Sequence, residues 1–145
     1  MSSENLFIFI VGCGRLGSFL ANRLSGKGHS IVVIDINDAA FDSLSAEYSG
    51  FRIVGDATEF NVLKEAKIED ADVFIATTRD DNVNLMVSQV AKKIFHVPKV
   101  MARVFEPKRE SIYKDFDIEA VCPTSLAVEL FLEAIAESIA VEKGN

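Results

Sequence analysis

Short apolar runs alternate with longer segments of mixed polarity along the whole chain, and this alternation constrains the fold most. The apolar runs occupy residues 6–11, 30–35, 51–54, 72–77, 99–104 and 118–121. The segments between and after them have helical periodicity and occupy residues 15–28, 38–48, 59–66, 81–95, 107–116 and 125–142. Runs that are almost wholly apolar are typical of strands covered on both faces. The sequence therefore predicts an α/β fold, a doubly wound parallel sheet of six strands with helices on both faces.

Length and charge narrow the class of protein. The chain has 145 residues, which suits one domain spanning 1–145. Its net charge of -7 argues against a nucleic-acid or anionic-membrane surface. No apolar run approaches the roughly 18 residues of a membrane span, and the start MSSENLFIFIVG lacks the basic flank of a signal peptide. The two cysteines stand in unrelated contexts, so neither a zinc site nor a disulfide is expected, and a reducing cytoplasm fits best.

A glycine-rich motif follows the first apolar run. Residues 10–17 read IVGCGRLG, so G-x-G-x-x-G comes after a predicted strand and opens a predicted helix. In this motif Gly12 makes the tight turn, Gly14 lets backbone approach a phosphate, and Gly17 lets the helix pack closely on the strand. The helix N-terminus adds free N–H groups and a partial positive charge. The motif makes the predicted sheet Rossmann-like and predicts a bound nucleotide.

Asp35 ends the second apolar run, 18 positions after Gly17. A carboxylate there accepts hydrogen bonds from ribose hydroxyls and repels a 2′-phosphate. NAD or another adenine nucleotide therefore fits better than NADP. The alternative is that Asp35 only begins a turn, since residues 35–38 read DIND.

Polar residues also follow the third and fourth apolar runs, at the sheet edge where ligands of open α/β folds bind. Residues 55–58 read GDAT, which either forms a turn with a helix cap or makes a rim for adenine, with Asp56 reaching its exocyclic amine. Thr77 and Thr78 satisfy backbone groups at a strand end or lie against ribose or phosphates.

Charged residues near the fourth and fifth runs complete this edge. Asp80 and Asp81 stand at a helix start, where capping is the default role. Arg103 lies in an otherwise apolar strand and needs a partner there, either a ligand phosphate or a partner carboxylate.

The ordered combination of these motifs resembles one family. The stretches FIVGCGRLGSFLANRLSGKGHSIVVIDIN, VGDATEFNVLKEAKIEDADVFIATTRDDNVNL and PKVMARV are similar to the nucleotide-binding lobe of the RCK family, also called the KTN or Trk/Ktr N-terminal domain. The resemblance covers essentially the whole chain. It implies a cytoplasmic regulatory subunit, peripheral to the inner face of the membrane through its partner. That partner would be a membrane potassium channel or transporter, controlled by bound NAD(H), ATP, ADP or AMP.

The resemblance also implies the residues of the site, by motif. These are the loop residues Gly12, Cys13, Gly14, Arg15, Leu16 and Gly17, the ribose turn Asp35, Ile36 and Asn37, the adenine rim Asp56, Ala57 and Thr58, and Thr77, Thr78, Asn84 and Arg103. Two departures from the family stand out. Many relatives have a second lobe, which is not expected here, and some carry a cation-binding glutamate where this sequence has Thr124. No metal site is therefore expected.

The sequence favours a binding module over an enzyme. A short-chain reductase pairs a tyrosine with a lysine four residues later, but Tyr48 is followed by Arg52 at that spacing, and Tyr113 by Asp117. Two histidines, at 29 and 96, fall after helices and away from the strand ends. The alternatives that stay open are a small NAD-dependent oxidoreductase and a nucleotide-sensing or structural interaction module for another partner.

The last helical segment, 125–142, predicts self-association. Its acidic residues Glu129, Glu133 and Glu137 form one stripe, and nearly every other position is apolar. One sheet face covers only part of such a helix, so the rest predicts a homodimer or higher oligomer. The resemblance agrees, because in the family this region packs on a neighbouring subunit. The alternative is a helix buried against its own domain.

Overall fold

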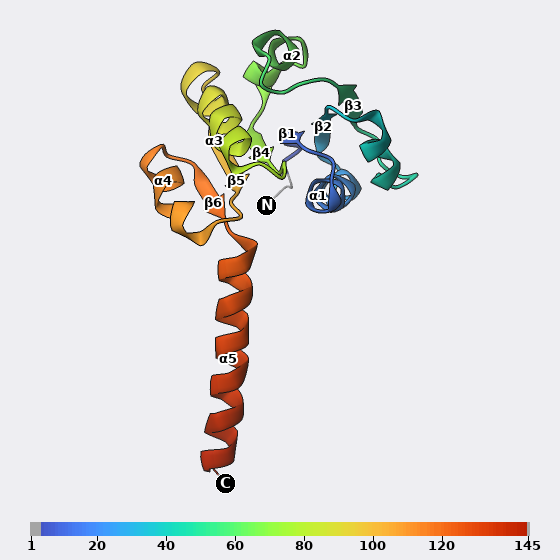
Figure 1. The fold of residues 1–145 in the computed structure, drawn as a ribbon. Helices are drawn as coiled ribbons and strands as arrows, with labels where there is room; N and C mark the ends of the chain where they lie inside the picture. The colour runs from blue at the N-terminus through green and yellow to red at the C-terminus, as the bar shows by residue number, and fades with distance from the viewer. Residues whose placement is uncertain (1–3, 145) are drawn as a thin grey trace.

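The computed structural model of the chain describes residues 4–144. Its centre is a single sheet of six parallel strands in the order β3-β2-β1-β4-β5-β6 (Figure 1). The strands are β1 (Phe7–Val11), β2 (Ser30–Asp35), β3 (Phe51–Val54), β4 (Val73–Ala76), β5 (Lys99–Arg103) and β6 (Glu119–Val121). The predicted Rossmann-like sheet is confirmed, and each predicted strand is present to within two residues at either end.

Helices connect the strands. The α-helices are α1 (Arg15–Gly26), α2 (Phe60–Glu65), α3 (Asp81–Gln89), α4 (Glu110–Asp115) and α5 (Pro123–Gly144). Shorter turns of helix are η1 (Asp38–Ser43), η2 (Ile68–Asp70), η3 (Val90–Ile94) and η4 (Pro107–Arg109). From β1 the chain adds β2 and β3 on one side of the sheet, and it then crosses over to add β4, β5 and β6 on the other side of β1. The direction of strand addition therefore changes between β1 and β4.

Both faces of the sheet are covered, which explains why the strand sequences do not alternate. On β1, Ile8 and Ile10 point into a cluster with Ala21 of α1 and with the segment that contains η1. Phe9 and Val11 point to the opposite face, into a cluster with residues of α2, α3 and α4. The four residues Ile8 to Val11 are all buried, so all four are apolar.

Three predicted helical segments, 38–48, 81–95 and 107–116, are not continuous α-helices, and the last of them is the 3₁₀ turn η4 followed by α4. The segment 38–48 forms only the 3₁₀ turn η1, and Leu44 then leaves it in extended conformation. Phe41, Leu44 and Tyr48 are nevertheless all buried on the same face of the sheet, so the helical spacing is satisfied without an α-helix. The segment 81–95 changes at Val90 from α-helix to a π-helical turn, η3.

The last helix, α5, extends away from the sheet (Figure 1). It begins at Pro123, two residues earlier than predicted, and proline is well suited to a first helical position. None of its residues is buried, and Phe131 is 71% exposed. The alternative that this helix packs against its own domain is therefore wrong. Among residues 4–144, no helix is both long enough and apolar enough to cross a membrane.

Candidate functional site

An open cleft of about 1560 Å³ lies at the carboxyl ends of the strands. The ends of β1, β2 and β5 and the loops that follow strands β1 to β5 line it, and Pro123 at the base of α5 adds to its wall. Every site residue expected from the sequence lines this cleft except Gly17 and Asn84. The strand ends that carry the predicted motifs thus meet at one place.

Two glycines of the loop are required by close packing. Gly12 has a φ of +100°, and its amide N–H donates to the Ile34 carbonyl at 2.8 Å. A Cβ atom on Gly17 would overlap the carbonyl oxygen of Gly12 and lie 2.8 Å from Oγ1 of Thr77. Gly17 therefore holds α1 against β1 beneath the cleft, as the motif predicts.

The third glycine, Gly14, faces open space. No atom lies within 4 Å of the position that its Cβ would take. It is the N-cap residue of α1, it supplies no side-chain cap, and no acidic residue stands in the first turn. The positive end of α1, with Arg15 as its first residue, is thus presented to the cleft with no carboxylate of its own. This is the arrangement that suits an anionic group.

Asp35 joins the glycine loop to the turn after β2. Its Oδ2 accepts the Cys13 N–H at 2.8 Å, and its Oδ1 accepts the Asn37 N–H at 2.8 Å. The carboxylate therefore does begin a turn, and it also lines the cleft. Each oxygen has a second lone pair for another donor. Beside it, Ile36 is 71% exposed and offers an apolar surface within the cleft.

Cys13 lies under the loop and is not a reactive group. Its side chain is buried among Ile10, Ile31 and Val33. Burial, with a smaller contribution from the Asp35 charge, raises the pKa of this thiol to about 11. The thiol is therefore neutral at physiological pH.

Asp56 forms a turn with Thr58 at the cleft rim. Its Oδ1 accepts the Thr58 N–H at 2.9 Å and the Thr58 hydroxyl at 2.7 Å. The bond from the hydroxyl, followed by the backbone bond, lowers the pKa of Asp56. Neither residue caps α2, whose N-cap position is Glu59. The turn interpretation is thus confirmed, and the carboxylate stays charged beside the cleft.

Asn84 lies below the cleft surface and joins the ends of β4 and β5. Its Oδ1 accepts the N–H of Thr78 at 2.9 Å and the Thr78 hydroxyl at 2.6 Å. Its Nδ2 donates to the carbonyls of Thr78 and Arg103 at 3.0 and 3.1 Å. Nearby, the Thr77 hydroxyl is shared between the carbonyls of Val11 and Gly12. These polar groups hold strand ends in place.

Arg103 finds a partner that sequence reasoning did not consider. Its Nη2 donates to the carbonyls of Thr77 and Thr78 at 2.6 and 2.9 Å, and its guanidinium lies 4.5 Å from the ring centre of Phe105. Its Nε is buried and has no hydrogen-bond partner within residues 4–144. Burial is the main reason that the pKa of Arg103 is lowered.

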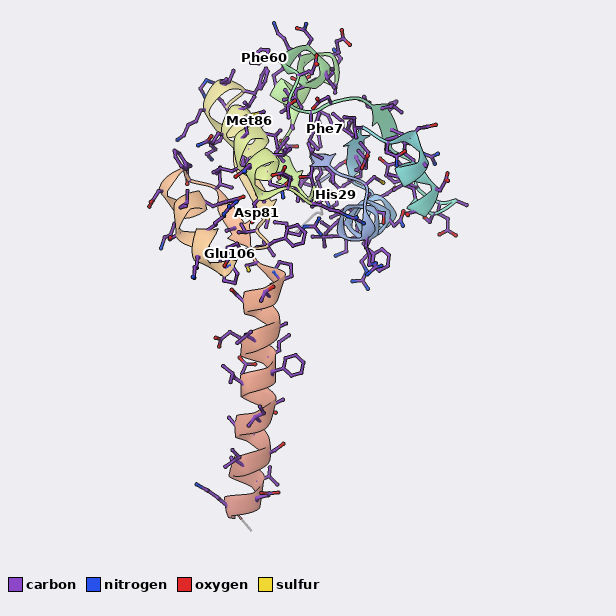
Figure 2. The ribbon with its side chains drawn as sticks, in the orientation of Figure 1. Phe7, His29, Phe60, Asp81, Met86 and Glu106 are labelled. Carbon is purple, nitrogen blue, oxygen red and sulfur yellow. The ribbon has the colours of Figure 1, made fainter. Side chains whose placement is uncertain are left out.

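The acidic pair at the start of α3 has two separate roles. Asp80 caps the helix by accepting the N–H groups of Asn82 and Val83, which confirms the capping interpretation. Asp81 instead accepts the N–H groups of Phe105 and Glu106 at 2.8 and 3.2 Å. Figure 2 shows Asp81 and Glu106 next to each other below α3. Asp81 therefore joins the loop after β5 to the start of α3.

Sequence reasoning missed several cleft residues. Arg79, Phe105, Phe19 and Pro123 all line the cleft. Arg79 was visible in principle, because it directly follows Thr78 at the end of β4. The other three lie on a helix, a loop and the base of α5, where no motif marks them.

The groups expected to be remote from the site are remote. Nδ1 of His29 accepts the N–H of Leu6 at 3.1 Å, at the amino end of β1. In the part of the chain that the structure describes, no three His, Cys, Asp or Glu side chains gather where they could hold a metal ion.

Comparisons with known proteins identify the family. The family model described as the TrkA-N domain matches residues 8–123. The Trk system potassium uptake protein TrkA of Streptomyces coelicolor is 35% identical over 133 residues, which are 92% of this chain and 60% of that protein. The chain therefore spans about 60% of the length of this relative.

Solved structures share the fold at lower identity. The GsuK channel bound to NAD has a TM-score of 0.79 at 22% identity, covering 97% of this chain and 25% of the channel chain. The Kef CTD of Shewanella denitrificans in its AMP-bound form has a TM-score of 0.72 at 22% identity, covering 90% of this chain and 80% of that one. With the match over residues 8–123, the chain belongs to the TrkA-N domain family.

Proposed function

We propose that this domain binds an adenine nucleotide in the cleft and thereby regulates a potassium channel or transporter. The observation that carries the proposal is the bond between the Cys13 N–H and the Asp35 carboxylate. It fixes a ribose acceptor beside the glycine loop and the positive end of α1. A phosphate fits over Gly14, where no atom lies within 4 Å of the Cβ position. The ribose then lies at Asp35, with adenine toward Ile36 and the Asp56 turn.

This binding mode fits NAD, NADH, ATP, ADP and AMP, which all contain adenosine 5′-monophosphate. The GsuK structure holds NAD and the Kef structure holds AMP, which supports a site built for that shared half. NADP is disfavoured, because its 2′-phosphate would lie against the Asp35 carboxylate.

The composition of the cleft supports a sensor over an enzyme. Among the described residues that line it, there is no histidine, tyrosine or lysine to transfer a proton. Its one thiol, Cys13, is buried and neutral. The TrkA relative is named as a potassium uptake protein. We therefore infer a cytoplasmic regulatory role, peripheral to a membrane partner; an interaction module for another partner would use the same cleft.

We also propose that α5 forms a homodimer or larger assembly. Its apolar side chains are exposed, with Leu130 at 66% and Phe131 at 71%. Figure 2 shows the helix extending from the rest of the domain with side chains along both of its visible edges. A lone helix with so much apolar surface in water is typical of an interface. Deleting residues 125–145 removes none of the buried core, so it is expected to give a folded monomer by light scattering. A monomeric full-length protein at micromolar concentration, or a dimeric truncated one, would refute this assembly.

The test of the site is Asp35→Ala, measured by calorimetry with NAD, ADP and NADP. Charge-assisted hydrogen bonds to ribose are each worth roughly 1.5–3 kcal/mol, so NAD and ADP affinity is expected to fall at least about tenfold. The preference for NAD over NADP should also shrink, and a merely structural role would not change that ratio. Asp42→Ala, an exposed acid outside the cleft, is the matched control. Unchanged affinities in a variant with an unaltered melting temperature would rule out the assignment of Asp35.

A further inference from the structure

Two arginines stand together at the ends of β4 and β5. Arg79 and Arg103 both line the cleft, and they are close enough for the charge of Arg79 to contribute to the lowered pKa of Arg103. Arg103 is held by two main-chain carbonyls and by Phe105. Arg79 is exposed, and it makes no ion pair or hydrogen bond to any residue from 4 to 144.

The acids near this pair are engaged by other groups of the protein. Asp81 offsets part of the charge on Arg103, but its oxygens already accept the N–H groups of Phe105 and Glu106. Asp80 accepts two N–H groups of α3. Asp81 also lies 4.0 Å from Arg109, and neither Asp80 nor Asp81 forms an ion pair with Arg79 or Arg103 among the described residues. The guanidinium of Arg79 is therefore available to an anion from outside the protein.

The cleft is also divided by charge along the row of strands. Asp35 ends β2 and Asp56 follows β3, whereas Arg103 ends β5 and Arg79, with Asp80 beside it, follows β4. The glycine loop follows β1, which lies between β2 and β4. Neighbouring strands are about 4.8 Å apart. A nucleotide with its ribose at the end of β2 and its first phosphate at the end of β1 therefore extends across the sheet toward β4. The next group along that direction reaches the end of β4.

We infer that Arg79 binds the second phosphate of the nucleotide, so that the cleft selects ligands with a diphosphate, such as ADP, ATP or NAD, over AMP. The inference rests on the proposed function, since it requires an adenine nucleotide in the cleft. The geometry suits it, because a guanidinium forms paired hydrogen bonds to phosphate oxygens. Arg103, fixed by its carbonyl partners, adds positive charge behind Arg79.

The test compares AMP, ADP and NAD binding to the full chain and to Arg79→Gln by calorimetry. ADP and NAD affinity should fall about tenfold, while AMP affinity changes less than about twofold. Arg79→Lys keeps the charge and should recover part of the loss. Arg23→Gln makes the same charge change on α1 outside the cleft, and should leave the ratio of ADP to AMP affinity as it is. The melting temperature of Arg79→Gln should equal that of the unaltered chain, because the Arg79 side chain makes no hydrogen bond or ion pair with residues 4–144.

The outcomes separate the two proposals. If Arg79→Gln weakens AMP and ADP equally, or weakens neither, the role of Arg79 is wrong while nucleotide binding by the unaltered chain keeps the proposed function. If the unaltered chain prefers AMP to ADP and NAD, the selection for a diphosphate is wrong. If it binds no adenine nucleotide, both proposals are wrong.

Discussion

Gly17→Ala tests the packing under the glycine loop. The added Cβ would overlap the carbonyl oxygen of Gly12 and lie 2.9 Å from its carbonyl carbon. These are backbone atoms, and the same oxygen accepts a bond from the Thr77 hydroxyl. Relief therefore requires α1 to move away from β1.

The size of the effect follows from two opposing contributions. Forcing a methyl group into a packed site costs about 1–3 kcal/mol, and the rigid neighbours of Gly17 favour the upper end. Alanine inside a helix regains about 1 kcal/mol over glycine. The net loss is about 2 kcal/mol, which corresponds to a fall of about 4–8 °C in melting temperature for a chain of this size.

The measurement is urea or thermal unfolding beside a matched variant, Gly14→Ala. The same methyl group at Gly14 meets no atom within 4 Å, so it should cost no more than about 1 kcal/mol. Gly14→Ala should instead weaken nucleotide binding, and Gly14→Val should abolish it in a folded protein, because the side chain fills the space proposed for a phosphate. The two glycines thus separate stability from binding. A Gly17→Ala protein as stable as the unaltered chain would refute the packing described here.

Two further residues give distinct predictions. Asn84→Ala should cost about 2–4 kcal/mol in urea unfolding, because the Thr78 N–H and the Arg103 carbonyl lose their bonds to this buried side chain. A loss under about 1 kcal/mol would contradict this. In a Cys122→Ala background, Cys13 should react with a thiol reagent at pH 8 at least about a hundredfold more slowly than in urea, since a pKa of about 11 leaves about one thiolate in a thousand. Because the folded thiol stays neutral where an unfolded one ionises, Cys13 should also make stability fall as pH rises from about 9 toward 11. Fast labelling at pH 8 would show that the loop opens.

The sequence predicted the sheet well because burial on both faces leaves a strong signal. Every residue of β2 between Ile31 and Ile34 is buried, and an uninterrupted apolar run records that directly. The prediction of a helix over residues 38–48 was wrong for a related reason. Its buried side chains at Phe41, Leu44 and Tyr48 have helical spacing, but a 3₁₀ turn and an extended link present them equally well.

The site was predictable where backbone geometry demands one residue type. A Cβ atom at Gly12 or Gly17 would crowd neighbouring backbone, so both positions require glycine and the motif can be recognised in the sequence. Asn84 was predicted to bind the ligand, but its side chain forms hydrogen bonds with Thr78 and Arg103, which lie 6 and 19 positions away in the sequence. Arg79 was missed although it directly follows Thr78, because a single exposed arginine belongs to no motif. Only the fold shows which charges stand beside it.

Pro123 lies both in the wall of the cleft and at the start of a helix of which no residue is buried. At 1.5 Å per residue, the 22 residues of α5 form an arm about 33 Å long. Tilting such an arm by about 5° at its pivot moves the far end by about 3 Å, the scale on which packed interfaces exchange contacts. At that pivot the Ser125 hydroxyl donates to the Glu110 carboxylate at 2.5 Å, which joins the base of α5 to α4. A small rotation at Pro123 in the cleft wall would therefore produce a displacement of several ångströms at the far end of α5.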